Sequence, residues 1–194
     1  MLPIISFQPL FMRLFVSINL PQDLENYLFE LQTRLPQARM SLPRSFHVTL
    51  KFLGEIEDDS MYDKVVSALG SATAKCVQDQ PLECVLKNRL GFFRHGKFIR
   101  VVFVDVQFPQ AVFSLQEDIE KDFGRLGFAI DHNFVPHITL ARIKYYEGVE
   151  FEHELIKIPV EQHGFMVDEI FLMESALSGE VAKYTVRERF TLLK

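Results

Sequence analysis

Apolar residues alternate with polar ones over several short stretches, which is the pattern of β-strands that bury one face in a core. Two such stretches, residues 46–53 and 135–143, place His and Thr on the face opposite the apolar side chains. The other stretches that we expect to be strands are 13–20, 82–93, 98–107, 156–161, 165–175 and 183–193. Polar turns at Arg94–Lys97 and around Ser178-Gly179 predict two hairpins among them.

Three further stretches have apolar residues at helical spacing. Pro at the start of a stretch suits the first turn of a helix, and Asp suits its N-terminal cap. The predicted helices are residues 23–35 after Pro21, a segment from Asp58 or Asp59 to about Ala74, and a segment from Pro109 to about Leu126 before Gly127. Together with the strands, they predict an α+β fold.

The order strand, helix, strand occurs twice along the chain. Residues 15–22 (FVSINLPQ) resemble residues 103–110 (FVDVQFPQ), displaced by 88 positions. An internal repeat indicates two related structural units. We therefore expect two pseudo-symmetric lobes, each a mainly antiparallel sheet with outer helices, enclosing a central cleft. No low-complexity linker separates them, so residues 1–194 form a single bilobal domain in which residues 1–11 are a short extension.

The sequence His-x-Thr-Leu also occurs twice, starting at His47 and at His137. Side chains two positions apart lie on the same face of a strand, so each motif presents one imidazole and one hydroxyl, from Thr49 or Thr139. A single His on a strand is more often structural. Two copies in facing lobes instead predict two His and two Thr around one small volume, a set of groups that suits a phosphate.

The sequences around the motifs are more specific than the motifs themselves. They are the opening RLFVSINLP at 13–21, the tail KFLGE at 51–55, the frame FVPHITLAR at 134–142, and ESALSG at 174–179 followed by Tyr184. With these features the chain resembles the two-histidine (2H) phosphoesterase superfamily, and within it the RNA 2′,3′-cyclic phosphodiesterases, historically called 2′-5′ RNA ligases. The resemblance spans nearly the whole chain.

Two imidazoles on opposite sides of phosphorus can activate water and protonate a departing ribose oxygen, because His titrates near neutral pH. Two Thr hydroxyls can hold the other phosphate oxygens. No metal or cofactor is needed for this chemistry. The resemblance implies that His47 is the proton donor and His137 the proton acceptor, and that the product is a 2′-phosphate. The near-symmetry of the two motifs does not itself separate acid from base.

Arg142 follows His137 by an odd number of positions, so a regular pleat would send it to the opposite face. A bulge would return it to the phosphate side. Both a substrate contact and a structural ion pair stay open for Arg142. Tyr184 and Phe52 either stack on a base or fill the core, and the core is favoured.

The formal net charge of −5 argues against a broad surface for long nucleic acid, but it leaves room for a small pocket that binds one RNA end. Cys76 and Cys84 have no metal-binding or redox spacing, so we expect free thiols and a cytoplasmic protein. No stretch is long and apolar enough to span a membrane. We expect a monomer without a metal site.

Three other functions stay open. The reverse reaction would join a cyclic phosphate end to a 5′-hydroxyl through a 2′-5′ linkage. The same pocket could act on a small cyclic nucleotide, because the substrates differ at the rim of the cleft. A non-catalytic RNA-binding module is the remaining alternative, although such a module could dispense with one motif histidine.

Overall fold

The computed structural model describes residues 12–56, 58–148, 150–178 and 181–194. The extension expected at residues 1–11 and the Gly179 of the second hairpin lie outside these ranges. The described elements are β1 (Met12–Asn19), α1 (Gln22–Thr33), β2 (Arg39–Ser41), β3 (His47–Ile56), α2 (Asp59–Lys75), β4 (Leu82–His95), β5 (Phe98–Gln107), α3 (Gln110–Arg125), β6 (His137–Tyr145), α4 (Glu150–Leu155), β7 (Gly164–Val167), β8 (Glu169–Ser178) and β9 (Val181–Thr191).

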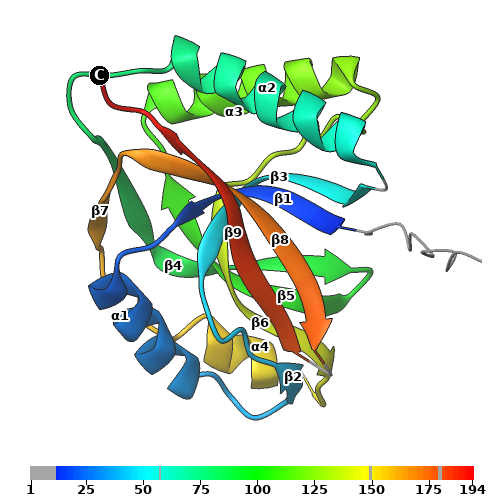
Figure 1. Ribbon diagram of the computed structural model, residues 1–194. Helices are drawn as coiled ribbons and strands as arrows, with labels where there is room; N and C mark the ends of the chain where they lie inside the picture. Colours follow the sequence, from blue (N-terminus) through cyan, green and yellow to red (C-terminus); the bar gives the residue numbers. More distant parts are fainter. Residues whose placement is uncertain (1–11, 57, 149, 179–180) are drawn as a thin grey trace, which may run out of the picture.

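The strands form one antiparallel sheet in the order β7-β4-β5-β6-β3-β1-β8-β9, with β2 paired to β6. The two motif strands, β3 and β6, meet at its centre through the register pair Val48 and Ile138. On either side of this pair the sheet divides into a first lobe of β1, β3, β8 and β9 and a second lobe of β2, β4, β5, β6 and β7 (Figure 1). The predicted two-lobed α+β fold is confirmed, and its two sheets are continuous through this contact.

The helices cross between the lobes. Helix α3 follows β5 of the second lobe but packs against β3 and α2, whereas α1 follows β1 of the first lobe but contacts β6 (Figure 1). Each helix also donates a side-chain hydrogen bond to the motif strand that it covers. Gln32 Nε2 donates to Leu140 O at 2.9 Å, and Gln116 Nε2 donates to Leu50 O at 3.4 Å. Each motif strand is therefore supported by the helix of the other repeat.

The carbonyls of Leu50 and Leu140, which accept these hydrogen bonds, belong to β-bulges. Thr49 pairs with Ser17 and Lys51 with Val16, so Leu50 is left without a partner in that register. A bulge shifts the alternation of side chains by one residue. The same break leaves Leu140 unpaired on β6, because Thr139 pairs with Phe103 and Ala141 with Val102. The bulges return the residues five positions after each motif histidine to the histidine face.

A buried charge network lies behind the first bulge. Lys51 and Glu120 are each about nineteen-twentieths buried, with relative exposures of 5% and 6%. Lys51 Nζ lies 2.5 Å from Glu120 Oε2 and also donates to Ala129 O. Glu120 Oε2 in turn accepts from the Asp131 amide at 3.1 Å. Strand β3, helix α3 and the loop that leads into β6 are thereby joined at one point.

Most predicted elements are present, and the two predicted hairpin pairs β4–β5 and β8–β9 are formed. The strand predicted at 156–161 is wrong. Helix α4 precedes this segment and buries Phe151 and Leu155, while Ile156 is 63% exposed. Pro159 also lacks the amide that a strand ladder requires.

Two strand boundaries also differ from the prediction. The single strand predicted over 165–175 is two strands, because β7 pairs with β4 and β8 pairs with β1. The chain crosses from one lobe to the other at Asp168, between them. Strand β3 does not end at Leu53, as predicted, but continues to Ile56, since Gly54 adopts a φ of 80° that lets the strand bend without a break. None of the described helices has the length and hydropathy to cross a membrane.

Replacing Lys51 by Met should lower the free energy of unfolding by about 3–5 kcal/mol, because Glu120 is left buried without its cation. Combining Lys51→Met with Glu120→Leu should recover a large part of that loss. Urea unfolding followed by circular dichroism measures both changes. Lys121→Met, at an exposed position of α3 next to Glu120, is the control. An unchanged stability of Lys51→Met would contradict the network.

Candidate active site

The two motifs converge where the lobes meet. The antiparallel register around Val48 and Ile138 places each histidine across from the threonine of the other motif. His47, Thr49, His137 and Thr139 all line one pocket of about 70 Å³. The remaining lining residues are Pro43, Ser45, Phe46, Arg142 and Tyr184. All five residues predicted to act on the phosphate are thus in contact with the same small volume.

The position of Arg142 follows from the bulge at Leu140. Because the alternation shifts by one residue there, Arg142 lies on the same face as His137 and Thr139 and lines their pocket. It therefore presents a positive charge to the site. Tyr184, which was expected to fill the core, lines the same pocket from β9.

The imidazole of His137 is held in one tautomer. Its Nδ1 lies 2.7 Å from Val135 O. A carbonyl oxygen only accepts hydrogen bonds, so Nδ1 carries the proton and donates it to this contact. In the neutral ring Nε2 then has a free lone pair. His137 is consequently oriented to accept a proton at Nε2.

Each imidazole packs between two aromatic rings. The ring centroid of His47 lies 4.9 Å from that of Phe15 and 5.0 Å from that of Tyr184. The ring centroid of His137 lies 5.1 Å from that of Phe103 and 4.8 Å from that of Phe93. Phe15 and Phe103 occupy the same place in the sequence repeat, so the aromatic support of the histidines repeats as well.

These supporting rings were not identified from the sequence, although the repeat contained a signal for two of them. Phe15 and Phe103 open the matching segments, on strands that pair with the motif strands. Gly91 leaves the space that the ring of Phe103 occupies, because a Cβ at position 91 would lie 2.2 Å from Phe103 Cε2. Phe103 can therefore lie against the backbone of β4 while it contacts His137.

Burial lowers the pKa of both histidines. The pKa of His47 falls to about 4, first because its ring is desolvated and then because His137 and Arg142 add positive charge nearby. Desolvation also lowers the pKa of His137, while its hydrogen bond to Val135 and the carboxylate of Asp105 oppose the change. The unliganded site therefore favours two neutral imidazoles at neutral pH.

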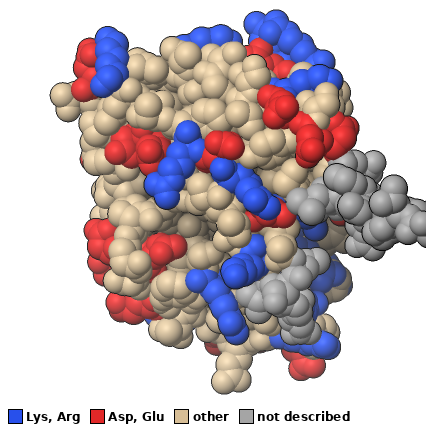
Figure 2. All heavy atoms as spheres, viewed as in Figure 1, with Lys and Arg blue, Asp and Glu red and all other residues tan. Residues whose placement is uncertain are grey.

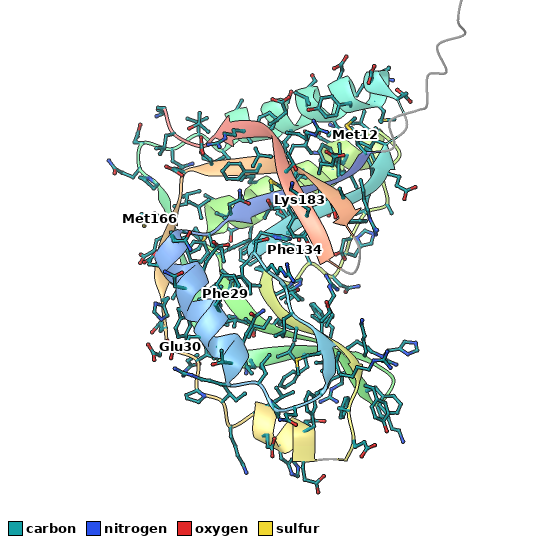
Figure 3. The ribbon with its side chains drawn as sticks, turned by 60° about the horizontal axis from the view of Figure 1, so that its bottom comes forward. Met12, Phe29, Glu30, Phe134, Met166 and Lys183 are labelled. Atoms are coloured by element: carbon teal, nitrogen blue, oxygen red, sulfur yellow. The ribbon has the colours of Figure 1, made fainter. Side chains whose placement is uncertain are left out.

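The site departs from symmetry beside the bulges. Phe52 occupies the position of the first motif that corresponds to Arg142, and its side chain is 51% exposed. It lines a second pocket of about 540 Å³ that also contacts Thr49 and His137. Phe93 and Phe134 contribute further aromatic surface there, and Phe134 lies between the two lobes (Figure 3). One side of the site is narrow and contains Arg142. The other is wide and combines three phenylalanine rings with the charged residues Lys51, Glu120 and Asp131.

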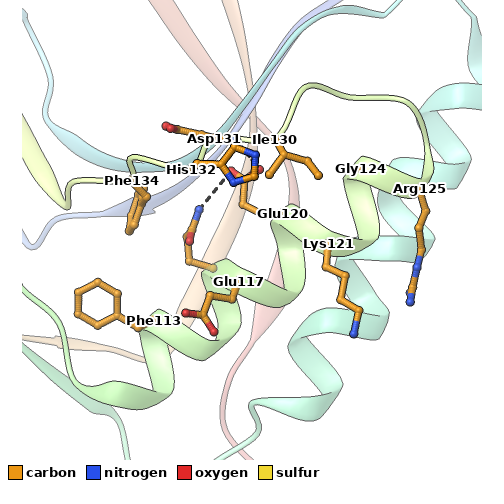
Figure 4. Close-up of a pocket in the computed structure, with 11 residues that line it drawn as sticks. Phe113, Glu117, Glu120, Lys121, Gly124, Arg125, Ile130, Asp131, His132 and Phe134 are labelled. Carbon is orange, nitrogen blue, oxygen red and sulfur yellow. Dashed lines mark hydrogen bonds between the residues drawn. The ribbon is translucent and has the colours of Figure 1, made fainter.

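A further pocket, of about 670 Å³, adjoins the second one and shares Glu120, Ile130, Asp131 and Phe134 with it. It is formed by α3 and the loop that precedes β6, between Phe113, Ile130 and Phe134 (Figure 4). Neither motif histidine lines it. Within the residues that the structure describes, no group of three or more His, Cys, Asp or Glu side chains is arranged to hold a metal ion.

On the face shown in Figure 2, Lys and Arg are interspersed with Asp and Glu. Cys76 and Cys84 are both buried and free. The face drawn in Figure 2 therefore carries charges of both signs and no broad cationic surface.

Comparison with known proteins agrees with the fold and with the family that the sequence resembles. An RNA 2′,3′-cyclic phosphodiesterase from Thermus thermophilus is 31% identical and covers 93% of this chain and 90% of its own. One from Methanothermobacter thermautotrophicus is 27% identical over 93% of this chain and 98% of its own.

Solved structures show the same architecture. TT0787 of Thermus thermophilus has a TM-score of 0.76 at 28% identity and covers 93% of this chain and 98% of its own. The fold is also that of E. coli LigT complexed with 3′-AMP, with a TM-score of 0.75 at 24% identity over 93% of this chain and 98% of its own. Residues 20–178 match the 2′-5′ RNA ligase superfamily. The chain belongs to this superfamily.

Proposed function

We propose that the protein hydrolyses the 2′,3′-cyclic phosphate at an RNA 3′ end to a 2′-phosphate without a metal ion, with His47 as proton donor and His137 as proton acceptor. The observation that carries this proposal is the single pocket lined by both histidines, both threonines and Arg142. The RNA 2′,3′-cyclic phosphodiesterases among its relatives support the same reaction.

In the proposed reaction, Nε2 of His137 takes a proton from water as the water oxygen attacks phosphorus. The bond from phosphorus to the 3′ oxygen breaks on the opposite side, and His47 gives that oxygen a proton. Thr49, Thr139 and Arg142 hold the non-bridging oxygens, where negative charge builds up. The tautomer fixed by Val135 supports the assignment of His137 as the base.

His47 must carry a proton before it can act as the acid, although its pKa in the unliganded site is about 4. A phosphodiester carries a negative charge, and an opposite charge nearby favours the protonated imidazole. Substrate binding would therefore raise the pKa of His47 and supply the protonated state. Neutral His47 in the free site and protonated His47 in the complex are then two stages of one cycle.

The wide aromatic pocket supports a nucleoside as the rest of the substrate. Phe52 and Phe93 border it beside Thr49 and His137, which contact the phosphate pocket as well. Bases stack on exposed aromatic rings without strong sequence preference. The phosphate would lie on the Arg142 side and the base on the Phe52 side.

With EDTA present, the purified protein should convert a short RNA that ends in a 2′,3′-cyclic phosphate into RNA with a terminal 2′-phosphate. The product is identified by ³¹P NMR and by its resistance to an enzyme that removes only 3′-phosphates. Turnover that stops on chelation would contradict the metal-independent mechanism. A 3′-phosphate product would mean that the 2′ oxygen, and not the 3′ oxygen, is the leaving group.

Replacing either His47 or His137 by Ala should lower kcat by about 10²–10⁴-fold, because each loses one proton transfer. Binding of an RNA with a terminal phosphate, measured by fluorescence anisotropy, should weaken much less. His153→Ala, at an exposed position in α4, is the matched control and should leave kcat unchanged. Activity that survives in the double His47→Ala, His137→Ala variant would refute the roles proposed here.

The pH profiles should separate the free protein from its complex. The profile of kcat/KM reports the pKa values of the free protein. Both imidazoles have lowered values there and His47 must be protonated to act, so kcat/KM should already fall as the pH rises towards about 6.5. The profile of kcat should lie at higher pH, because the bound phosphodiester raises the pKa of His47. Initial rates between pH 4 and pH 9 test this. Coincident profiles of kcat and kcat/KM would show that the bound substrate does not raise the pKa of His47.

A further inference from the structure

Strand β4 has a wide bulge near the active site. Leu86 pairs with Val106 and Leu90 with Val104, so three residues of β4 lie opposite a single residue of β5. These are Lys87, Asn88 and Arg89. They form a pocket of about 300 Å³ together with Leu86, Gln107 and Gln162. The bulge thus concentrates two cations and three side-chain amides at one place.

Gln107, which lines this pocket, lies two residues after Asp105 on β5, so both side chains lie on one face of the sheet. Asp105, the single residue of β5 opposite the bulge, is the register partner of His137. Its carboxylate raises the pKa of His137, so its charge acts on the imidazole. Arg89 Nε lies 3.7 Å from Asp105 Oδ2. Arg89 therefore extends over the face of β5 that continues into the catalytic pocket.

The distance from this pocket to the catalytic pocket is short. The bulge on β4 is separated from β6 by β5 alone, and neighbouring strands lie about 4.7–4.9 Å apart. The backbone of the bulge is therefore about 10 Å from that of His137. Phe93, which lines the aromatic pocket, follows the bulge on β4, so one strand borders both. A nucleotide next to the terminal one can reach the bulge.

The two cations are available to a ligand. The Arg89 side chain is 73% exposed and is only partly neutralised by Asp105 at 3.7 Å. Lys87 is exposed and takes part in no ion pair within the described residues. Cations beside side-chain amides, without an apolar wall, suit a phosphate and its sugar better than a base.

We propose that the pocket at the β4 bulge binds a phosphodiester of the RNA chain on the 5′ side of the terminal cyclic phosphate, with Lys87 and Arg89 as its cations. This proposal rests on the proposed function and narrows its substrate to an RNA chain. A mononucleotide has no phosphodiester on that side. The contact therefore selects an RNA end over a small cyclic nucleotide.

The double variant Lys87→Ala, Arg89→Ala tests the contact with two substrates, a nucleoside 2′,3′-cyclic phosphate and a short RNA that ends in the same cyclic nucleotide. We expect kcat/KM for the RNA to fall about tenfold, the combined effect of two partly exposed charge contacts. For the mononucleotide it should stay within about twofold. The ratio of the two values is the readout, because a change at His137 through Asp105 affects both substrates equally.

Salt provides an independent measurement. The slope of log(kcat/KM) for the RNA against log[salt] should become shallower by about 0.7 in the double variant, since one phosphate contact with a single strand contributes about 0.7. Lys64→Ala, Lys121→Ala removes two exposed cations from the outer helices and is the charge-matched control. An equal loss on both substrates, or no loss on the RNA, would overturn the proposal.

Binding separates this proposal from the proposed function. If the wild-type protein cleaves neither substrate, the proposed function fails, and fluorescence anisotropy with a short RNA that has a 3′-terminal phosphate still tests the bulge. Weaker binding of this RNA by the double variant than by the control variant supports the site. Equal binding by the two variants overturns it.

Discussion

The pairing of Val48 with Ile138 is the constraint on which the rest of the site depends. It joins the two half-sheets, and the residues on either side of Val48 and of Ile138 are the motif histidines and threonines. Because the strands diverge beyond this pair, a pocket forms on each side of it. A longer ladder between β3 and β6 would close these pockets, and separate sheets would not hold the two motifs together.

The two pockets differ in their side chains although the fold around them is nearly symmetric. The histidines, threonines and supporting phenylalanines repeat, but Arg142 on one side corresponds to Phe52 on the other. Asp105 adds a negative charge beside His137, where the other repeat has Ser17. A phosphate and a base then have different preferred sides. Under the proposed mechanism, this asymmetry also separates the acid from the base.

Burial of the two motif histidines disfavours the protonated form of each imidazole. Aromatic rings exclude water from both imidazoles, so neither is readily protonated in the free protein. The loop that supplies Val135 to His137 is held in place by Lys51 and Glu120 behind the sheet. A charge network in the core of one lobe thus positions the base of the other lobe.

The sequence by itself determined the motifs, the repeat, the two lobes and most strands and helices, because alternation and helical spacing are local properties. It also placed the candidate phosphate residues on two faces that had to meet. The position of Arg142 stayed undecided, since it depends on a bulge stabilised by Gln32 from a distant helix. The segment 156–161 was misassigned because its alternation outweighed the signal of Pro159, and the packing of α4 leaves it without a strand partner. The crossing of the helices, the aromatic support of the histidines and the bulge of Lys87 and Arg89 were decided by tertiary structure alone, because each depends on contacts between residues far apart in the chain.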